Sequence, residues 1–220
     1  MMPAAPFPSP EALRAALSGP LPGLPAQLEM APLPRPGTVA YPDTPDDCVP
    51  AAVLILIYPK DGAPHVVFIR RPSHSVHHKD QIAFPGGQIE GAESAVQAAL
   101  REAREEVGVR TELVRVSGAL TPLYIPPSGY CVSPVVGLAD EIPEFVPFPE
   151  EVAEVLEIPL ALLLDPATIR RETWNLDRGP VRVPFYAFGR HKIWGATAMI
   201  LAEFLAVLRS AENGPGEGSA

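Results

Sequence analysis

The chain has 220 residues, which fits one domain with extensions and a core of substantial size. Its 26 Asp and Glu residues outnumber its 17 Lys and Arg residues, so the formal net charge is −9. The basic residues are scattered, with no stripe of the kind that follows a nucleic-acid backbone, and we expect no polymeric nucleic-acid partner. A small phosphate-bearing substrate remains compatible with the charge, because a divalent cation reverses the local potential.

The cysteines and the apolar runs indicate the compartment. Cys48 and Cys131 lie far apart without C-x-x-C spacing, so the sequence indicates neither a zinc site nor a disulfide framework, and it fits a reducing, cytoplasmic location. The first residues lack a basic segment before an apolar run, which argues against a signal peptide. The longest apolar runs, residues 49–58 and 193–208, are shorter than a membrane span of about 18 to 20 residues, so we expect no membrane partner.

Residues 1–45 are rich in proline and alanine and predict a loosely packed N-terminal extension with one short helix at residues 10–17. From Val49 the composition changes. Continuous apolar residues predict strands at 49–59 and 64–71, joined by the turn "KDGA". A polar loop and a short apolar step then lead into Pro85-Gly86-Gly87.

A helix is predicted over residues 93–107. Val96, Leu100, Ala103 and Val107 repeat at i+4, i+3 and i+4 and form one apolar stripe, from which Glu102 and Glu106 point away. Gly108 is expected to end this helix, because glycine readily adopts the left-handed conformation found after helix termini.

The second half of the chain predicts further strands and a closing helix. The strands fall at residues 112–124, 130–139, 168–176 and 181–189, and the helix at 194–208 is apolar around most of its surface. Mixed strands with few long helices indicate an α/β class, in which a mixed sheet is sandwiched between helices. We assign the domain to residues 46–209 and expect a disordered tail at 210–220.

Three carboxylates crowd the predicted helix. Glu102 and Glu106 are four residues apart and therefore neighbours on one face, with Glu105 beside them. Two carboxylates about 5 Å apart repel by roughly 3 kcal/mol at an effective dielectric near 20. The cluster therefore indicates a bound cation, and carboxylate oxygens are the ligands that hard divalent cations prefer.

The spacing around these residues resembles the signature of the Nudix hydrolases, G-x5-E-x7-R-E-U-x-E-E-x-G-U, where U is apolar. It is met here at the positions Gly87, Glu93, Arg101-Glu102, Glu105-Glu106 and Gly108. The resemblance covers about residues 49–208 and implies a metal-dependent pyrophosphohydrolase of the Nudix fold.

The resemblance also implies roles for individual residues. Glu102, Glu105 and Glu106 would bind Mg²⁺ or Mn²⁺, and Glu102 or Glu105 would act as the base, with Arg101 in the catalytic group. Glu93 and Gly108 would be structural. Glu150 and Glu151 precede a predicted amphipathic turn before Pro159, and Glu151 would be an added ligand or base. Its alternative role is a charge that stabilises a helix N-terminus.

The segment before the Gly87 motif resembles the coenzyme A pyrophosphatase branch of the family, R-S-x-x-x-R-x-H-x-G-Q-[IV]-[AS]-F-P-G-G. Val76 and Asp80 stand where that branch has an arginine and a glycine. The implied substrate is coenzyme A or an acyl derivative, cut into 3′,5′-ADP and a phosphopantetheine product. The expected substrate-binding residues are Arg70, Arg71, His78, Gln81, Gly86 and Gly87.

Other interpretations stay open from the sequence. The substrate is alternatively ADP-ribose, a dinucleotide or a nucleoside triphosphate, or the chain is a non-catalytic nucleotide sensor. A zinc site at His74, His77 and His78 would lack cysteine partners. Tyr130, Trp174 and Trp194 either line a pocket or fill the core. A homodimer is permitted by the apolar final helix.

Overall fold

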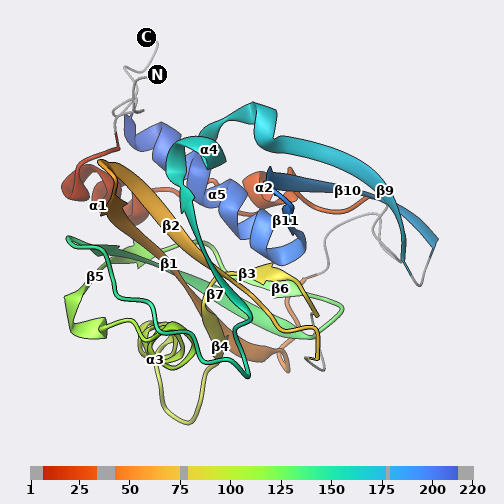
Figure 1. The fold of residues 1–220 in the computed structure, drawn as a ribbon. Coiled ribbons are helices and arrows are strands. Elements are labelled where there is room, and N and C mark those ends of the chain that lie inside the picture. Colours follow the sequence, from red (N-terminus) through yellow and green to blue (C-terminus); the bar gives the residue numbers. More distant parts are fainter. Residues whose placement is uncertain (1–6, 34–42, 75–78, 177–178, 213–220) are drawn as a thin grey trace.

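A computed structural model describes residues 7–33, 43–74, 79–176 and 179–212 of the chain (Figure 1). These residues form a large mixed sheet and a separate three-stranded antiparallel sheet. The strands of the large sheet are β1 (Val49–Lys60), β2 (Ala63–Arg70), β3 (Ile82–Ala83), β4 (Gly86–Gln88), β5 (Val114–Ala119), β6 (Leu123–Ile125), β7 (Tyr130–Ala139) and β8 (Glu154–Pro159). Those of the small sheet are β9 (Ile169–Leu176), β10 (Gly179–Phe188) and β11 (His191–Trp194).

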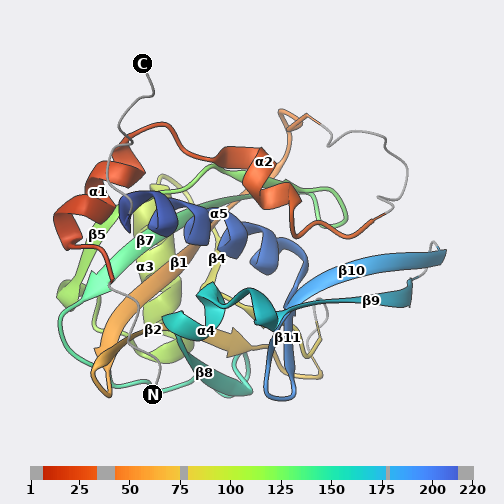
Figure 2. The ribbon, with the colours of Figure 1, turned by 90° about the horizontal axis from the view of Figure 1, so that it is seen from above.

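Helices cover both faces of the large sheet, as the predicted class requires (Figures 1 and 2). They are α1 (Pro10–Ser18), α2 (Gly23–Leu28), α3 (Ala95–Val107), α4 (Leu160–Leu164) and α5 (Gly195–Glu212), with single 3-10 turns at Thr111–Leu113 and Pro166–Thr168. The central path of the sheet runs β3-β2-β1-β7-β5, with β1 parallel to β7 and antiparallel to β2.

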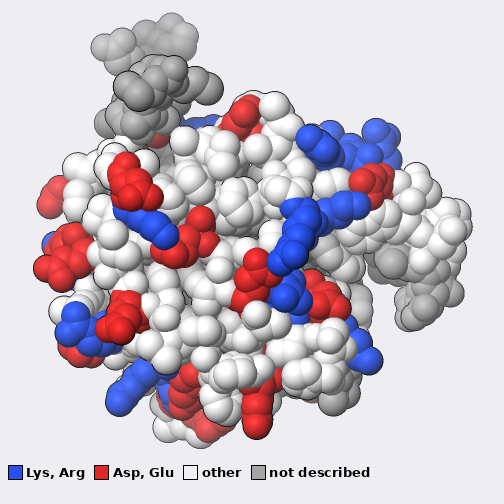
Figure 3. Space-filling view, viewed as in Figure 1, with Lys and Arg blue, Asp and Glu red and all other residues white. Residues whose placement is uncertain are grey.

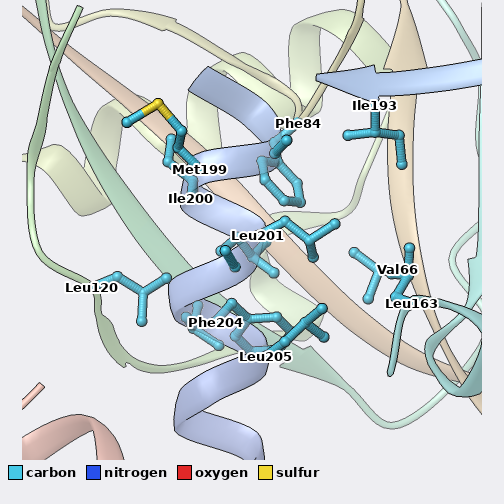
Figure 4. Packing of buried hydrophobic residues seen from close by; sticks show 14 of the residues in the cluster. Val66, Phe84, Leu120, Leu163, Ile193, Met199, Ile200, Leu201, Phe204 and Leu205 are labelled. Atoms are coloured by element: carbon cyan, nitrogen blue, oxygen red, sulfur yellow. The ribbon is translucent and has the colours of Figure 1, made fainter. Parts of the chain in front are cut away.

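The core has two parts because β1 is buried on both faces. Leu54 and Leu56 pack with Ala103 of α3 in one cluster. Ile55 and Ile57, which alternate with them, belong to the cluster on the opposite face. In that second cluster α5 is buried on several sides, and Figure 4 shows its residues Leu201, Phe204 and Leu205 among the sheet side chains. The continuous apolar run of β1 is thus explained by its central place.

The expectation of a loosely packed N-terminal extension is wrong for residues 7–33. Leu13, Leu17 and Met30 are buried in the cluster around α5. The buried carboxylate of Glu203 on α5 accepts hydrogen bonds from the backbone N–H of Gly23 at 3.1 Å and from Gln27 Nε2 at 2.7 Å. This segment therefore completes the core, and a domain boundary at residue 46 stays a prediction.

The expectation that the two cysteines are unlinked is also wrong. Cys48 and Cys131 form a disulfide with their Cα atoms 5.8 Å apart. The parallel pairing of β1 with β7 places Pro50 opposite Cys131, so residues 83 positions apart in sequence meet at one end of the sheet. Sequence spacing carries no sign of that pairing.

Two further segments differ from the sequence interpretation. Residues 154–159 form strand β8, which pairs with β2, where an amphipathic turn was expected. The closing helix extends to Glu212, so residues 210–212 are helical, while the rest of the predicted tail lies outside the described residues. No helix in the described ranges is both long enough and apolar enough to cross a membrane.

Candidate active site

Both ends of helix α3 are fixed by local sequence. The side chain of Ser94 accepts a hydrogen bond from the backbone N–H of Gln97. The side-chain oxygen of Gln97 in turn accepts one from the backbone N–H of Ser94. Gly108 ends the helix in the left-handed conformation at φ 71°, as predicted. The small residues Ala99 and Ala103 face the sheet and are fully buried, so α3 lies close to it. The turn carrying Arg101 to Glu106 is therefore held firmly against the sheet.

The glycine pair in β4 is required by close packing. A Cβ atom on Gly86 would lie 2.3 Å from the backbone oxygen of Ala52 in β1. One on Gly87 would lie 2.5 Å from Glu102 Oε1. Glycine therefore allows the backbone of β4 to approach both the sheet and the acidic helix.

Glu106 is the most enclosed of the three carboxylates. Its side chain is 2% exposed, accepts a hydrogen bond from the backbone N–H of Gly86 at 2.8 Å, and lies 3.8 Å from Arg71 Nη2. Burial raises the pKa of Glu106 to about 8, against the opposing effects of Arg71 and Gly86, and the charges of Glu102 and Glu151 raise it further. The sequence placed Glu106 away from the apolar stripe but did not show that it is buried.

Glu102 shares this enclosed space. Its side chain is 14% exposed and accepts a hydrogen bond from Arg101 Nη1 at 2.9 Å. Burial raises the pKa of Glu102, Arg101 opposes this shift, and the charges of Glu105 and Glu151 add to it. Glu102, Glu106 and Glu151 thus lie near enough to one another for each charge to act on its neighbours.

Arg101 organises the motif, as the spacing predicted. Its guanidinium donates to Glu93 Oε1 at 2.8 Å, to Glu105 Oε2 at 3.0 Å and to the backbone oxygen of Gln88 at 3.0 Å, besides the bond to Glu102. The hydrogen bond from Arg101 lowers the pKa of Glu93. Glu105 remains 56% exposed at the rim. The planar guanidinium of Arg101 therefore links three glutamates to strand β4.

Glu151 lies in the extended segment after β7, which packs against the C-terminal end of α3. The backbone N–H groups of Val146 and Phe148 donate to the oxygens of Val107 and Glu106 at 2.9 and 2.8 Å. The N–H of Glu151 then donates to the oxygen of Phe148 at 3.0 Å. No helix begins at Glu151 in this described segment, so its alternative role at a helix N-terminus is wrong.

The residues expected to bind substrate are divided between two places. Arg71 joins the acidic cluster, where Nη2 lies 3.4 Å from the oxygen of Gly86, and its backbone N–H binds the oxygen of Gln81. Arg70 faces elsewhere and pairs with Asp80 at 2.8 Å and Glu154 at 3.0 Å. The sequence did not predict the pairing of Arg70 with Glu154. These residues lie opposite each other on β2 and β8, and β8 was not expected. His77 and His78 lie outside the described residues.

The donor set fits a hard divalent cation. As they are arranged, the described His, Cys, Asp and Glu side chains include no group of three that already encloses a metal site, and Arg101 holds Glu102 and Glu105. Even so, Glu102 and Glu106 are buried close to other carboxylates. They also lie beside Gly86 and Gly87, where a larger residue would not fit. A cation with oxygen ligands would relieve that repulsion.

An acidic helix packed against strand β4, in a mixed sheet covered by helices, defines an α/β protein with a carboxylate-rich site. Residues 49–175 match the family model of the NUDIX domain. The chain therefore belongs to the Nudix family, and it is a pyrophosphohydrolase, as its sequence predicted. Nudix hydrolases generally use divalent metal ions and act on small nucleotide-diphosphate substrates.

Relatives named "Uncharacterized Nudix hydrolase NudL" are similar along most of their length. The protein of Photorhabdus laumondii is 38% identical over 152 residues, which is 69% of this chain and 80% of the relative. That of Yersinia enterocolitica is 40% identical over 155 residues, 69% of this chain and 77% of the relative. Among solved structures, the Nudix hydrolase RenU from M. smegmatis is 28% identical with a TM-score of 0.42, covering 50% of this chain and 70% of that one.

Proposed function

We propose that this Nudix hydrolase cleaves the diphosphate of coenzyme A or acyl-coenzyme A into 3′,5′-ADP and (acyl-)phosphopantetheine, using Mg²⁺ or Mn²⁺. The observation that carries the hydrolytic part is the enclosed pair Glu102 and Glu106 facing Gly86 and Gly87. The substrate is supported by the segment around Arg71, Gln81 and Phe84-Pro85-Gly86-Gly87, which resembles the coenzyme A pyrophosphatase branch.

Each residue has a chemical task in this proposal. Glu102, Glu106 and either Glu105 or Glu151 would hold the cation, which supplies neutralisation of the phosphoryl oxygens and a more acidic water. Glu102 or Glu105 would accept a proton from the attacking water, as the resemblance to the family implies. Arg101 positions these carboxylates, and Arg71 provides a positive charge for a phosphate oxygen.

One observation favours a second substrate class. Asp80, which replaces the glycine of the coenzyme A branch, forms an ion pair with Arg70 and so competes with a phosphate for this guanidinium. ADP-ribose, a dinucleotide or a nucleoside triphosphate, none of which carries the 3′-phosphate of coenzyme A, is therefore the alternative substrate.

A substrate panel separates the two. The protein is incubated with Mn²⁺ or Mg²⁺ and coenzyme A, acetyl-coenzyme A, ADP-ribose, diadenosine tetraphosphate or ATP, and products are identified by mass spectrometry. The Glu106→Gln variant, prepared in parallel, controls for contaminating hydrolases. We expect 3′,5′-ADP from coenzyme A at the highest kcat/KM. If ADP-ribose or a dinucleotide is cleaved and coenzyme A is not, the proposed substrate is wrong and the cleaved compound takes its place. If no anhydride is cleaved, the proposed hydrolytic activity is wrong.

The compartment and assembly remain predictions. We keep a cytoplasmic location and a homodimer as expectations, although the Cys48–Cys131 disulfide removes the argument from unpaired cysteines, since disulfides are rare in reducing compartments. Light scattering of the purified chain tests the dimer, and the thiol state of protein extracted under acid quench tests the compartment.

A further inference from the structure

An open hollow lies beside the small sheet, apart from the acidic helix. The hairpin β9–β10 projects from the body and β11 returns next to the end of β2 (Figures 1 and 2). Between them is a hollow of about 500 Å³ that is open to solvent. Its chemistry comes from Arg70, Asp80, Trp174, Arg190, Lys192 and Trp194, which we call the indole pocket.

The aromatic wall of the indole pocket is supported by the sheet. The rings of Trp174 and Trp194 meet edge to face with centroids 5.0 Å apart. Phe185, which is buried, packs against Trp174 at 6.2 Å and lies opposite Trp194 in the β10–β11 register. Both indoles remain half-buried and line the hollow. Trp174 Nε1 donates to Glu172 Oε2 at 2.8 Å and Lys192 Nζ lies 5.5 Å from the centroid of the Trp174 ring, so an entering ring stacks on Trp194 or takes the place of the Lys192 ammonium over Trp174.

The polar wall is mainly positive. Arg70, Arg190 and Lys192 line the hollow, whereas Asp80 is the single acidic residue in the described lining. Glu154 and Glu172 are outside the lining and hold the cations: Arg70 and Arg190 each lie 3.0 Å from Glu154, and Lys192 lies 2.5 Å from Glu172. Figure 3 shows blue side chains on the face over β11 and the base of the β9–β10 hairpin. Arg190 is 76% exposed, so an anion can reach it.

The indole pocket is joined to the acidic helix through neighbouring residues. Arg70 lines the pocket, and the next residue, Arg71, reaches Gly86 and Glu106. On the adjoining strand Glu154 holds Arg70, while Glu151, three residues earlier, acts on Glu102 and Glu106. The backbone N–H of Ala153 donates to the oxygen of Arg70 at 2.9 Å and fixes the two segments together. Arg70 and Arg71 alternate between the two faces of the sheet, so a substrate that contacts both sites passes around the end of β2.

We propose that the indole pocket binds the nucleoside end of the substrate, with a purine base against Trp174 and Trp194 and a ribose phosphate at Arg190 and Lys192. This inference rests on the proposed function, because it treats the substrate as a nucleotide diphosphate. Stacking of bases on aromatic side chains is strong and needs no hydrogen-bond code. The adjoining guanidinium and ammonium groups would exchange their bonds to Glu154 and Glu172 for charge-assisted bonds to a phosphate such as the 3′-phosphate of coenzyme A.

The chain offers a direct probe of binding. It has two tryptophans, and both line the indole pocket, so its indole fluorescence reports on this place alone. Adenosine 3′,5′-bisphosphate, adenosine and inorganic phosphate are titrated separately into the protein in EDTA, where no hydrolysis occurs. We expect saturable quenching by the bisphosphate at a Kd at least tenfold below that for adenosine, because the phosphate adds charge-assisted bonds. Fluorescence unchanged by the bisphosphate would overturn the proposal.

Variants test the polar wall. The double change Arg190→Gln and Lys192→Gln should weaken binding of the bisphosphate about tenfold or more, with much less effect on adenosine. The matched control is Arg115→Gln, which breaks another exposed ion pair, to Asp140 at 2.6 Å, and should leave the titration unchanged. Equal affinity of the double variant and the parent would contradict the assignment. Circular dichroism confirms folding, and Arg190→Gln alone serves if the double variant does not fold.

The two proposals fail in different ways. Quenching by the bisphosphate without turnover of any anhydride would refute the proposed function and keep the pocket as a nucleotide site. Turnover of coenzyme A without quenching by coenzyme A or the bisphosphate would keep the function and refute the pocket.

Discussion

The carboxylate of Glu106 accepts a hydrogen bond from the backbone N–H of Gly86 at 2.8 Å, although the two residues are 20 positions apart in the chain. This bond joins the glycine strand β4 to the acidic helix α3. Because Gly86 also pairs with Val53 of the central strand β1, the candidate site is anchored to the middle of the sheet.

Stability of the metal-free protein should fall as the pH rises from about 5 to about 8. Burial raises the pKa of Glu106 to about 8 in the folded state, above its ordinary value of 4.5. Between these values the unfolded chain has lost a proton that the folded chain keeps, so this group lowers the unfolding free energy by up to about 1.4 kcal/mol per pH unit. Urea denaturation in EDTA measures the slope. Glu106→Gln should flatten it, and an equal slope in both proteins would contradict the burial argument.

Arg101→Lys should reduce both stability and turnover. A lysine ammonium cannot reproduce the planar fork that contacts Glu93, Glu102, Glu105 and the oxygen of Gln88. We expect a loss of about 1 to 3 kcal/mol in unfolding free energy and a lower kcat. Arg104→Lys, at an exposed position of the same helix, is the matched control. Wild-type stability and rate in Arg101→Lys would show that the network does not position the carboxylates.

Gly87→Ala should impair activity more than folding. The added Cβ atom would lie 2.5 Å from Glu102 Oε1, so the carboxylate must move. We expect kcat to fall at least tenfold, since small displacements in an active site reduce rates by this order. Gly19→Ala, whose Cβ atom would make ordinary contacts at 3.6 Å, should have no such effect. Initial rates and melting curves of the two variants decide the comparison.

Reduction of the Cys48–Cys131 disulfide should destabilise the protein. The bond closes a sequence separation of 83 residues, and such bonds contribute about 2 to 4 kcal/mol, largely by restricting the unfolded chain. Thermal melting with and without dithiothreitol measures the effect, and Cys48→Ser should match the reduced protein. If the melting temperature does not respond to reductant, the link does not contribute in solution.

The sequence predicted what depends on periodicity and local turns. Strands β1, β2 and β7, helix α3 and its end at Gly108 follow from apolar spacing and from the conformational preference of glycine. The network of Arg101 follows from helical geometry, because Glu105 is one turn away and Glu93 about two.

What the sequence could not predict depends on contacts between distant segments. Glu106 is buried because β4 and Arg71 enclose it, and no local pattern encodes that enclosure. Cys48 meets Cys131 only through the parallel pairing of β1 and β7. The indole pocket needs β11 and the β9–β10 hairpin beside β2, and β11 was not expected at all.

Binding of Mn²⁺ to Glu106→Gln, followed by electron paramagnetic resonance alongside turnover, tests the central claim most directly. Glutamine keeps the shape and an oxygen for the N–H of Gly86 but removes the charge, and Glu112→Gln at an exposed position is the control. We predict that Glu106→Gln stays folded, binds Mn²⁺ at least tenfold more weakly and loses about 100-fold or more in kcat, while Glu112→Gln matches the parent. Parent-like Mn²⁺ affinity and rate in folded Glu106→Gln would contradict a metal site at the acidic helix.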